Sequence, residues 1–581
     1  MSSPKELITI MLSSVFERQG WDSALIDVAP PSDIRFGDYA TPVALKLAKV
    51  LRRSPQEVAV PIIEGVKSNL ENKYIDLDKV SYQAGFINFR MSDLFYKEAV
   101  RAILKEGAYD GVKELEIEGQ EGYGKTVILD YFQLNIAKQP HVGHLRSAVI
   151  GDALKRILLF RGYRVVADTH VGDWGTQFGI LLYAYKKAVE GNEREVDAIK
   201  NDPFIKLQEL YVAANQEEDI HEKGKTEFAK LEKGDALNRT IWRWMVEISM
   251  KKLEDNAVRL NLLPFEEHRG ESVYEEAMPQ VVELALVKGV AKKTEDGAVV
   301  VDLIKEGLDE AVLVKSDGAT TYLLRDLATI QYRKARYDFW KNLYVVDNRQ
   351  SHHFRQVFRV AELLGLEGVG ASEHIEFGFM KLPEGTMSTR QGNVILLEAV
   401  LDEAERRARA VIYEKNPNLR NIDEVAKQIG LGAIKFFDLS HNRKSDIVFR
   451  FEDALSFEGK TGPYIQYTYA RLKSILRKSV DEAKDAFPDG VSLDADEREL
   501  LLHCVRLPET IQRVIDAWLP HLLVDHLFEL AQLANEFYHS HPILTEQDED
   551  KRRVLLTIVR AVTTTLAKGL YLLGIDALEE M

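Results

Sequence analysis

The chain has 581 residues, 45% of them hydrophobic, and because a single hydrophobic core stops growing near ~250 to 300 residues, several domains are expected. One cysteine, Cys504, excludes a disulfide framework and a thiolate zinc site and favours a reducing, cytoplasmic location, while no apolar run reaches the ~18 residues of a membrane span. The net charge of −16 excludes a general electrostatic coat on nucleic acid, so any polyanion must be met by a local basic patch.

Residues 1–115 form the first predicted unit, a small α+β domain. Helical spacing of apolar residues predicts one helix around Leu7 to Val15 and a second in "ATPVALKLAKVL", and β-formers alternate in "VSYQAGFINFRMS". The first helix carries Glu6 and Arg18 where a signal peptide would need an uninterrupted apolar segment. The charged, non-periodic "KELEIEGQEGYGK" predicts the boundary to the next unit.

Residues 116–440 form the second predicted unit, an open α/β sheet. "KTVILDY" and "RVVADTHV" are typical of buried parallel strands, and the helical pattern between them ends at Gly162. The sheet pattern resumes with strands in "NLYVVD" and "HIEFGFM". Residues 185–310, between the two halves, are charged and mostly helical in pattern, which predicts a solvated helical insertion into a doubly wound parallel sheet.

Residues 441–581 form the third predicted unit, an all-α bundle, because long amphipathic runs continue to the end of the chain. Within residues 441–480, eight Lys/Arg face four Asp/Glu, a local charge of +4. Tyr464, Tyr467 and Tyr469 lie among these cations, a mixture that suits RNA backbone and unstacked bases. A solvated helix face over an aromatic core explains any single one of these residues equally well.

The stretch "NIAKQPHVGHLRS" lies after the first strand of the sheet and begins a helix, the place where an open α/β sheet binds phosphate. His141 and His144 can donate hydrogen bonds to oxygens that gain charge in phosphoryl or nucleotidyl transfer, and Gly143 leaves room for a ligand. The dinucleotide, Walker and zincin patterns are all missing. Two capping histidines at a helix start remain the alternative, and Arg146 is expected on the helix surface.

Five motifs, in order along the chain, resemble class I aminoacyl-tRNA synthetases and, within that class, the arginyl-tRNA synthetase family. They are "NIAKQPHVGHLRSAVIGDAL", "THVGDWGTQFG", "GATTYLLRDLATIQYR", "VVDNRQSHHFRQVFRVAELLG" and "TMSTRQGN". "GFINFRMS" resembles the family's N-terminal tRNA-contacting domain, and "FEGKTGPYIQYTYAR" its anticodon-binding domain. The resemblance covers nearly the whole chain and implies a Rossmann-like class I catalytic domain.

The resemblance also implies a function and a site. The expected reaction joins L-arginine to tRNA(Arg) through an arginyl-adenylate, with ATP as substrate, Mg²⁺ accompanying the ATP, no zinc, no membrane and a monomeric enzyme. The residues implied in catalysis are Lys138, His141, His144 and Arg390. Those implied around arginine are Asp130, Asn135, Tyr322, Asp326 and Gln350. Those implied around ATP are Gly143, His170, Gly172, Asp173, Gln177, Met387, Ser388 and Thr389, and those implied around tRNA are Asn88, Tyr464, Tyr467 and Arg471.

The hydrogen-bonding requirements of a guanidinium support arginine as the substrate. A guanidinium requires acidic and neutral acceptors, and Tyr322 and Asp326, four residues apart, share one helix face. Each residue alone has an ordinary explanation, Tyr322 as a packed core residue and Asp326 as a partner of Arg325. The closest rival is a class I synthetase for another amino acid. A small nucleotidyltransferase would lack the helical C-terminal unit, and a non-catalytic paralogue would be expected to lose His141, His144 or Asp326.

Two departures from the family pattern affect the site. Thr389 stands where the second signature of the class usually has a catalytic lysine, and Arg390 follows it. Many arginine-specific members combine this loss with a lysine three residues before the first histidine, and Lys138 occupies that place. We therefore expect Lys138 and Arg390 to stabilise the pyrophosphate leaving group together. The second departure, Phe132-Gln133-Leu134, lies beside Asn135 and weakens the assignment of that residue.

Overall fold

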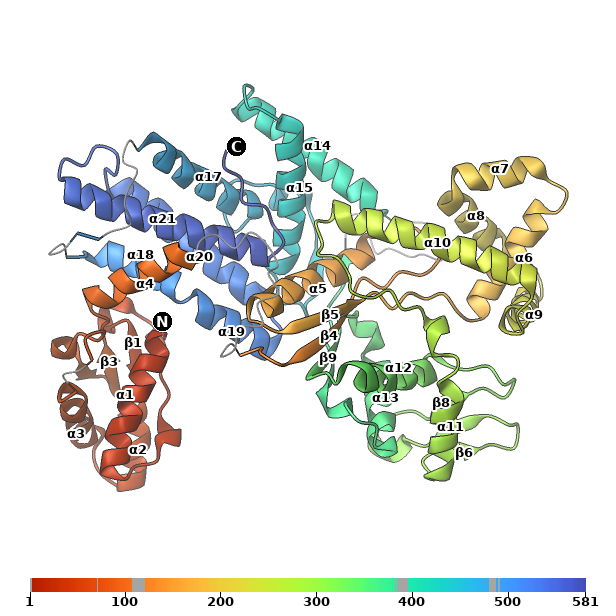
Figure 1. Ribbon diagram of the computed structural model, residues 1–581, viewed down its shortest axis with the longest axis horizontal. Helices are drawn as coiled ribbons and strands as arrows, with labels where there is room; N and C mark the ends of the chain where they lie inside the picture. Colours follow the sequence, from red (N-terminus) through yellow and green to blue (C-terminus); the bar gives the residue numbers. More distant parts are fainter. Residues whose placement is uncertain are drawn as a thin grey trace.

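The computed structural model describes residues 3–69, 72–106, 121–381, 383, 395–479, 487–488 and 492–581. An N-terminal unit and a bundle of C-terminal helices lie to one side of a central sheet, and a helical insertion extends to the other side (Figure 1). The predicted signature at 386–390, which includes Met387, Ser388, Thr389 and Arg390, lies outside the described residues.

The N-terminal unit packs three helices on a small antiparallel sheet. Its helices are α1 (Pro4–Gln19), α2 (Val43–Leu51) and α3 (Pro55–Lys67), and its strands β1 (Tyr39–Thr41), β2 (Ser81–Gln83) and β3 (Phe86–Phe89) pair in the order β1-β3-β2. Ser3 begins α1 with a capping box and Gly20, at φ 70°, ends it. Helix α4 (Asp93–Glu106) leads toward the C-terminal helices. The predicted helices and strand signals of this unit are confirmed.

The central sheet has four parallel strands in the order β10-β9-β4-β5. They are β4 (Thr126–Asp130), β5 (Arg164–Asp168), β9 (Lys341–Tyr344) and β10 (Ser372–His374), with α5 (Val142–Phe160) and α13 (Ser351–Leu364) as crossover helices. The strand order changes direction between β4 and β9, so the carboxyl ends of these strands form the expected ligand crevice. Gly162, at φ 79°, follows α5 as predicted.

One predicted strand differs. "HIEFGFM" was expected to be a single strand, but β10 ends at its first residue and β11 (Met380–Lys381) forms a separate parallel pair with β12 (Ile447–Val448). The single predicted strand is therefore replaced by two short strands in different sheets. The chain leaves the main sheet after β10, and β11 then pairs with the segment that follows α15 (Ile422–Leu439).

The insertion is helical at first, with α6 (Thr176–Val189), α7 (Glu193–Asn201), α8 (Pro203–Ala214), α9 (Ile220–Glu232) and α10 (Ala236–Arg259). The prediction of helix up to residue 310 was wrong for its last part. After α11 (Met278–Val287), the strands β6 (Lys292–Lys293), β7 (Val299–Val301) and β8 (Ala311–Val314) form an antiparallel sheet that leads into α12 (Tyr322–Tyr337). These strands are very short and separated by charged turns, so they lack a periodic signal.

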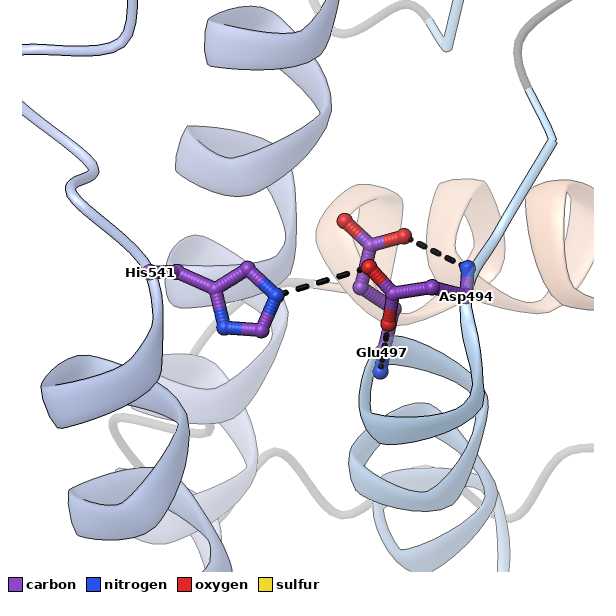
Figure 2. Close-up of side chains that lie close together, drawn as sticks. All are labelled: Asp494, Glu497 and His541. Carbon is purple, nitrogen blue, oxygen red and sulfur yellow. Dashed lines mark hydrogen bonds and ion pairs between the residues drawn. The ribbon is translucent and has the colours of Figure 1, made fainter.

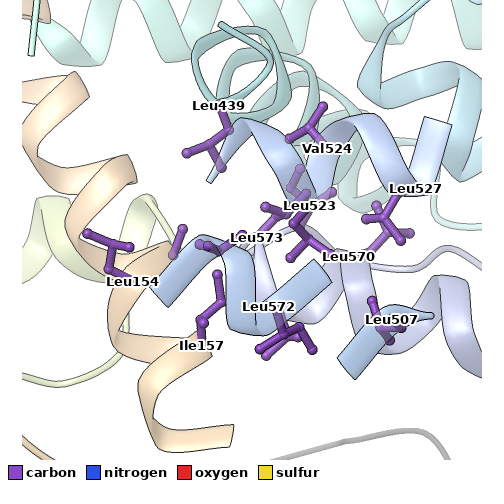
Figure 3. Close-up of a cluster of buried hydrophobic side chains, with 14 of the residues drawn as sticks. Leu154, Ile157, Leu439, Leu507, Leu523, Val524, Leu527, Leu570, Leu572 and Leu573 are labelled. Carbon is purple, nitrogen blue, oxygen red and sulfur yellow. The ribbon is translucent and has the colours of Figure 1, made fainter. Parts of the chain in front are cut away.

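Apart from the short β12, the described elements of residues 441–581 are helices, as predicted. They are α16 (Phe451–Ala454), α17 (Gly462–Lys478), α18 (Ala495–Val505), α19 (Leu507–Ala517), α20 (His521–Ser540) and α21 (Glu549–Leu572). Two further helices, α14 (Leu397–Lys415) and α15, come before residue 441, and α15 packs against α17. Figure 3 shows that Leu154 and Ile157 of α5 share one apolar cluster with Leu523 of α20 and Leu570 of α21. The helix that begins at the histidine motif is therefore packed directly against the C-terminal helices.

Helix α21 is, among the described residues, the one helix long and apolar enough to cross a membrane by length and composition. However, 78% of its apolar window is buried inside the protein. It packs against α4, α17, α18 and α20, as the core helix of a bundle does.

Candidate active site

The two histidines of "HVGH" cap α5. His141 is the N-cap residue, and its Nδ1 accepts a hydrogen bond from the Gly143 N–H at 3.0 Å. His144 completes a capping box, because its Nδ1 accepts from the His141 N–H at 3.1 Å. The ring centroids are 3.9 Å apart. The capping alternative is thus observed, but it uses only one nitrogen of each ring, and in a neutral imidazole the other nitrogen, Nε2, must carry the proton.

Both rings are neutral near physiological pH. Burial lowers the pKa of His141 to about 4, with further contributions from the charges of Arg349 and Lys138. Burial lowers the pKa of His144 to about 3, helped by the neighbouring His141. Neutral rings whose Nδ1 atoms accept from the backbone offer two fixed Nε2–H donors at the start of a helix, where the helix dipole favours an anion.

Position 143 requires a glycine for a steric reason that the sequence did not reveal. A Cβ at this position would lie 2.7 Å from Cε1 and 2.8 Å from Nδ1 of His141. The glycine therefore makes room for the capping imidazole. Its exposed position still leaves the backbone accessible to a ligand.

The segment that follows the second signature returns to the histidines. The Val142 N–H donates to the Ile395 carbonyl at 3.1 Å, and the Leu397 N–H donates to the Pro140 carbonyl at 3.0 Å. Residue 395 is the first described residue after 384–394. The start of α5 is thus hydrogen-bonded to residues 395–397, which come shortly after the second signature along the chain.

Two cations accompany the histidines. Lys138 is exposed, its Nζ lies 5.3 Å from the ring centroid of Tyr211 in the insertion, and desolvation lowers its pKa. Arg349, which the sequence analysis did not single out, pairs with Asp347 at 2.8 Å and lies over the Phe379 ring. Its charge contributes to the lowered pKa of His141, so it is close to the motif. A cation after the end of β9 was the signal that could have revealed it.

Asp130 lies behind the site. It is fully buried at the end of β4 and pairs with Arg333 at 2.6 Å, and Arg333 also pairs with Asp168 at 2.9 Å. Its second oxygen accepts from Gln133 at 2.6 Å. Because both oxygens are engaged and buried, the geometry does not place Asp130 in contact with a substrate, in contrast to the expectation from the sequence.

Three residues that follow β4 and β5 along the chain have strained backbone. Phe132 (φ 59°), Ala137 (φ 59°) and His170 (φ 36°) occupy the left-handed region that favours glycine. The departure beginning at Phe132 is accommodated because this side chain is buried and its N–H donates to the Ser147 hydroxyl at 3.0 Å. Non-glycine residues in this region cost about 1–3 kcal/mol each and cluster at functional sites.

The predicted arginine residues come from three elements. Asn135 is exposed and forms a parallel bridge with Gly172, so the first and second motifs meet here. Tyr322, 56% exposed, begins α12, and Gln350 is exposed just before α13. Asp326 lies one turn after Tyr322, and its Oδ2 is 2.6 Å from Nε2 of His353.

Glu271 is a site residue that the sequence analysis missed. It is buried, its Oε2 accepts from Nη1 of Arg325 at 2.7 Å, and a Cβ on Gly172 would lie 3.7 Å from its Oε1. Burial raises the pKa of Glu271 to about 7, and the charge of Arg325 acts in the opposite direction. The Arg325 guanidinium also lies 5.0 Å from the Tyr322 ring centroid. A lone glutamate in "RGESVY" carries no periodic or motif signal that would have revealed it.

The residues predicted around ATP differ in burial and in hydrogen bonding. Asp173 is buried and accepts from the Ser272 N–H at 3.0 Å and hydroxyl at 2.6 Å, so its carboxylate supports a loop and does not face the crevice. His170 has a buried Nδ1 without a hydrogen-bond partner among the described residues. Gln177 is exposed in the first turn of α6.

The predicted tRNA residues are divided between surface and interior. Tyr467 is 48% exposed, and Arg471 lies 3.9 Å from the ring centroid of Tyr538. The Tyr464 hydroxyl accepts from Asn535 at 3.0 Å. Asn88 is only 3% exposed, so it lies below the surface in contrast to the expected contact with RNA.

Arg146 was expected on the surface of α5, and this expectation was wrong. It is 1% exposed and donates to the carbonyl oxygens of Gly378 (2.7 Å) and Ser445 (2.9 Å) as well as to Asp438. These carbonyls flank β11 and β12, so Arg146 holds the first turn of α5 against the strand that leads toward the second signature. An arginine can be buried when it is paired with a carboxylate and hydrogen-bonded, and here Nε and Nη1 of Arg146 reach acceptors while Nη2 has none among the described residues.

A group of possible metal ligands lies far from the crevice along the chain, in the C-terminal helices. Figure 2 shows His541 facing Asp494, which together with Glu497 caps the start of α18. The Lys551 ammonium lies 2.8 Å from Glu497 Oε1 and 3.2 Å from Asp494 Oδ2. A cation of the chain itself already neutralises these carboxylates.

Three family models match the chain. One described as the arginyl tRNA synthetase N-terminal domain matches residues 4–91, one described as the catalytic domain of class I tRNA synthetases (R) matches 111–451, and the DALR anticodon binding domain matches 465–581.

Named proteins and solved structures agree with these matches. The chain is 38% identical to the arginine–tRNA ligase of Halothermothrix orenii, covering 96% of this chain and 95% of the relative. It is 39% identical to that of Clostridioides difficile, covering 96% of each. The structures of arginyl-tRNA synthetase from Thermus thermophilus (27% identity, TM-score 0.80) and Plasmodium falciparum (25%, 0.82) are similar over 100% of both chains.

Proposed function

This chain belongs to the arginyl-tRNA synthetase family of class I enzymes and joins L-arginine to its tRNA at the expense of ATP, and we propose roles for individual residues in that reaction. The observation that carries the proposal is the pair of neutral histidines, His141 and His144, whose Nδ1 atoms cap α5 while their Nε2–H groups remain available. Donors fixed before the reaction stabilise developing charge without reorganisation.

In the first step, the arginine carboxylate attacks the α-phosphorus of ATP and pyrophosphate leaves. We assign His141 and His144 to the oxygens that gain negative charge, and Lys138 and Arg390 to the leaving pyrophosphate. Arg349 is a further cation beside His141. ATP enters as its Mg²⁺ complex, and we assign no side chain to the metal ion.

The arginine subsite is proposed at the junction of the first, second and third motifs. Tyr322, Asp326 and Glu271 supply one neutral and two acidic acceptors for the guanidinium, as its planar donors require. Asn135 and Gln350 are exposed and are assigned to the α-amino and carboxylate groups. We assign Gly143, Gly172 and His170 to the nucleotide side.

In the second step, the ribose of the tRNA terminal adenosine attacks the adenylate, and AMP leaves. Tyr467 and Arg471 on α17 are proposed to contact the anticodon region, because the exposed Tyr467 ring and the partly exposed Arg471, which lies against Tyr538, suit unstacked bases. We further propose a monomeric enzyme of the cytoplasm, where the buried thiol of Cys504 stays reduced.

The test is ATP–pyrophosphate exchange with each amino acid, with and without total tRNA. The expected result is exchange driven by arginine alone among the amino acids. Exchange driven instead by glutamine or cysteine would overturn the substrate assignment. Loss of arginine-dependent exchange in His141→Ala and His144→Ala, with an unchanged unfolding transition, would support the roles of the histidines.

A further inference from the structure

His353 is placed to act on the arginine subsite without belonging to it. It lies in the first turn of α13, three residues after Gln350, and its Nε2 is 2.6 Å from Oδ2 of Asp326 on α12. The side chains of His353 and Asp326 are 24% and 15% exposed, so the contact is partly shielded from water. Its ring packs edge-on against Phe354 at 5.5 Å.

The contact uses one oxygen of the carboxylate that is assigned to the substrate guanidinium. A carboxylate held at Oδ2 has a fixed plane, and Oδ1 is then left to accept a hydrogen bond from a ligand in a defined direction. Without the imidazole, the Asp326 side chain can rotate about χ1 and χ2. Fixing an acceptor in advance lowers the entropic cost of binding.

The protonation state of His353 affects how strongly the subsite attracts the substrate guanidinium. Glu271 pairs with Arg325, which keeps its charge. Asp326 pairs with His353, which can gain or lose a proton. A protonated His353 neutralises Asp326 and competes with an incoming guanidinium, whereas a neutral His353 donates a hydrogen bond and leaves the negative charge for the substrate.

We propose that His353 is a positioning residue for arginine recognition, which holds the Asp326 carboxylate through Nε2 and sets its net charge toward the substrate guanidinium. This inference rests on the proposed role of Asp326. Nearby titratable groups are Asp326 on α12, Tyr344 in β9, His374 in β10, which stacks on Phe354, and His352 on α13, which pairs with the exposed Asp309. Glu271, whose pKa is raised to about 7 by burial and in part by the charge of Asp326, titrates in the same range. The side-chain hydrogen bond and charge of Asp326 raise the pKa of His353 against the effect of burial.

The chain supplies a matched control for the test. His352 is the neighbouring residue on the same helix turn, with a 43% exposed side chain and a surface partner, Asp309, at 3.3 Å. The variants are therefore His353→Leu and His353→Gln, each beside the same change at His352, together with Asp326→Asn. KM for arginine and kcat are measured by aminoacylation at saturating ATP and tRNA between about pH 6 and pH 8.5, the range in which a histidine changes its charge.

His353→Leu is expected to raise KM for arginine about tenfold or more with kcat changed less than about threefold, because substrate binding loses a positioned acceptor. His353→Gln, which retains a neutral N–H donor, is expected to restore KM at pH 7.5 to within about threefold of the unchanged enzyme. Protonation of Glu271 near pH 7 should raise KM at low pH in every variant. The unchanged enzyme should show a further rise in KM as pH falls through the pKa of His353, and His353→Gln should lack this further rise. The His352 variants should match the unchanged enzyme.

The variants distinguish a failure of the arginine subsite at Asp326 from a failure of the role of His353. If Asp326→Asn leaves KM for arginine unchanged, the proposed subsite itself is overturned. If Asp326→Asn raises KM while His353→Leu and the pH profile of His353→Gln match the unchanged enzyme, only the role of His353 is overturned. Should His353→Leu fail to fold, the pH profile of His353→Gln decides.

Discussion

Arg146 and Asp438 form an ion pair in the interior, with Nε and Oδ1 3.0 Å apart and side chains 1% and 0% exposed. The pair joins the first turn of α5, which carries the histidines, to α15, and Arg146 also donates to the carbonyls beside β11 and β12. Because α5 further shares an apolar cluster with α20 and α21, the position of His141 and His144 depends on the C-terminal helices.

Replacing Arg146 by Met should destabilise the protein by about 3–5 kcal/mol, since it leaves a buried carboxylate without a partner. Burial already raises the pKa of Asp438, so the loss should diminish at low pH, where this group binds a proton. Urea unfolding followed by circular dichroism measures the change. The control is Arg35→Met, whose 86% exposed side chain pairs at the surface with Asp33, and which should leave the transition unchanged. An unshifted midpoint in Arg146→Met would contradict the assignment.

The two roles of His144 can be separated by two amide substitutions. His144→Asn places an acceptor where Nδ1 caps the His141 N–H, whereas His144→Gln places a donor near the position of Nε2. We expect His144→Asn to keep the unfolding midpoint and to lose about 10²–10³-fold in kcat, the usual cost of one donor to a developing charge. His144→Gln should lose less activity and more stability. Equal activity of both variants would assign the ring to capping alone.

Much of the fold could be predicted from the sequence because it depends on local periodicity. The strands around Ile128 and Val166 are short apolar runs, and their parallel pairing follows from the helix between them. The antiparallel sheet at 292–314 could not be predicted, because strands as short as Lys292–Lys293 are fixed by their partners and not by a pattern of their own.

The site was predictable where a motif brings residues together within a few positions. His141 and His144 lie one turn apart, and the sequence predicted for both either a role in catalysis or a role as helix caps. Glu271 and Arg325 are 54 residues apart, and only the fold shows that they pair. Asp130 was assigned to the substrate because a sequence cannot show that Arg333, far along the chain, engages its carboxylate.

The capping histidines should make stability depend on pH in a defined direction. Their folded pKa values, about 4 for His141 and about 3 for His144, lie below the unfolded value of 6.5. Between pH 4 and pH 6.5 the unfolded chain therefore binds more protons, so stability is fully present above pH 6.5 and falls as the pH decreases. The expected loss at pH 5 is about 1–2 kcal/mol per histidine. Comparison of His144→Asn with the unchanged protein from pH 5 to pH 8 isolates this contribution, which should be smaller in the variant.

Lys138→Ala should lower arginine-dependent pyrophosphate exchange by about 10²-fold, because a cation near the leaving group acts mainly in the transition state. The effect is expected in kcat more than in KM for arginine, since the proposed arginine subsite consists of other residues, Tyr322 and Asp326 among them. Lys206→Ala, at a surface position of the insertion, is the control and should retain full exchange. Unchanged turnover in Lys138→Ala would remove this residue from the chemistry and leave Arg349 as the described cation beside His141.

Tyr467 offers the most direct test of the RNA-binding surface, because its ring is 48% exposed on α17 while Tyr464 is held by Asn535. Stacking of one base on an aromatic ring contributes about 1–3 kcal/mol, so Tyr467→Ala should raise KM for tRNA by roughly tenfold without moving the unfolding midpoint. Tyr413→Ala is the matched control, since this tyrosine is 66% exposed on α14. Aminoacylation at varied tRNA concentration measures the change. An equal effect of both substitutions would indicate a general loss of aromatic surface, whereas an effect confined to Tyr467 places the RNA on α17.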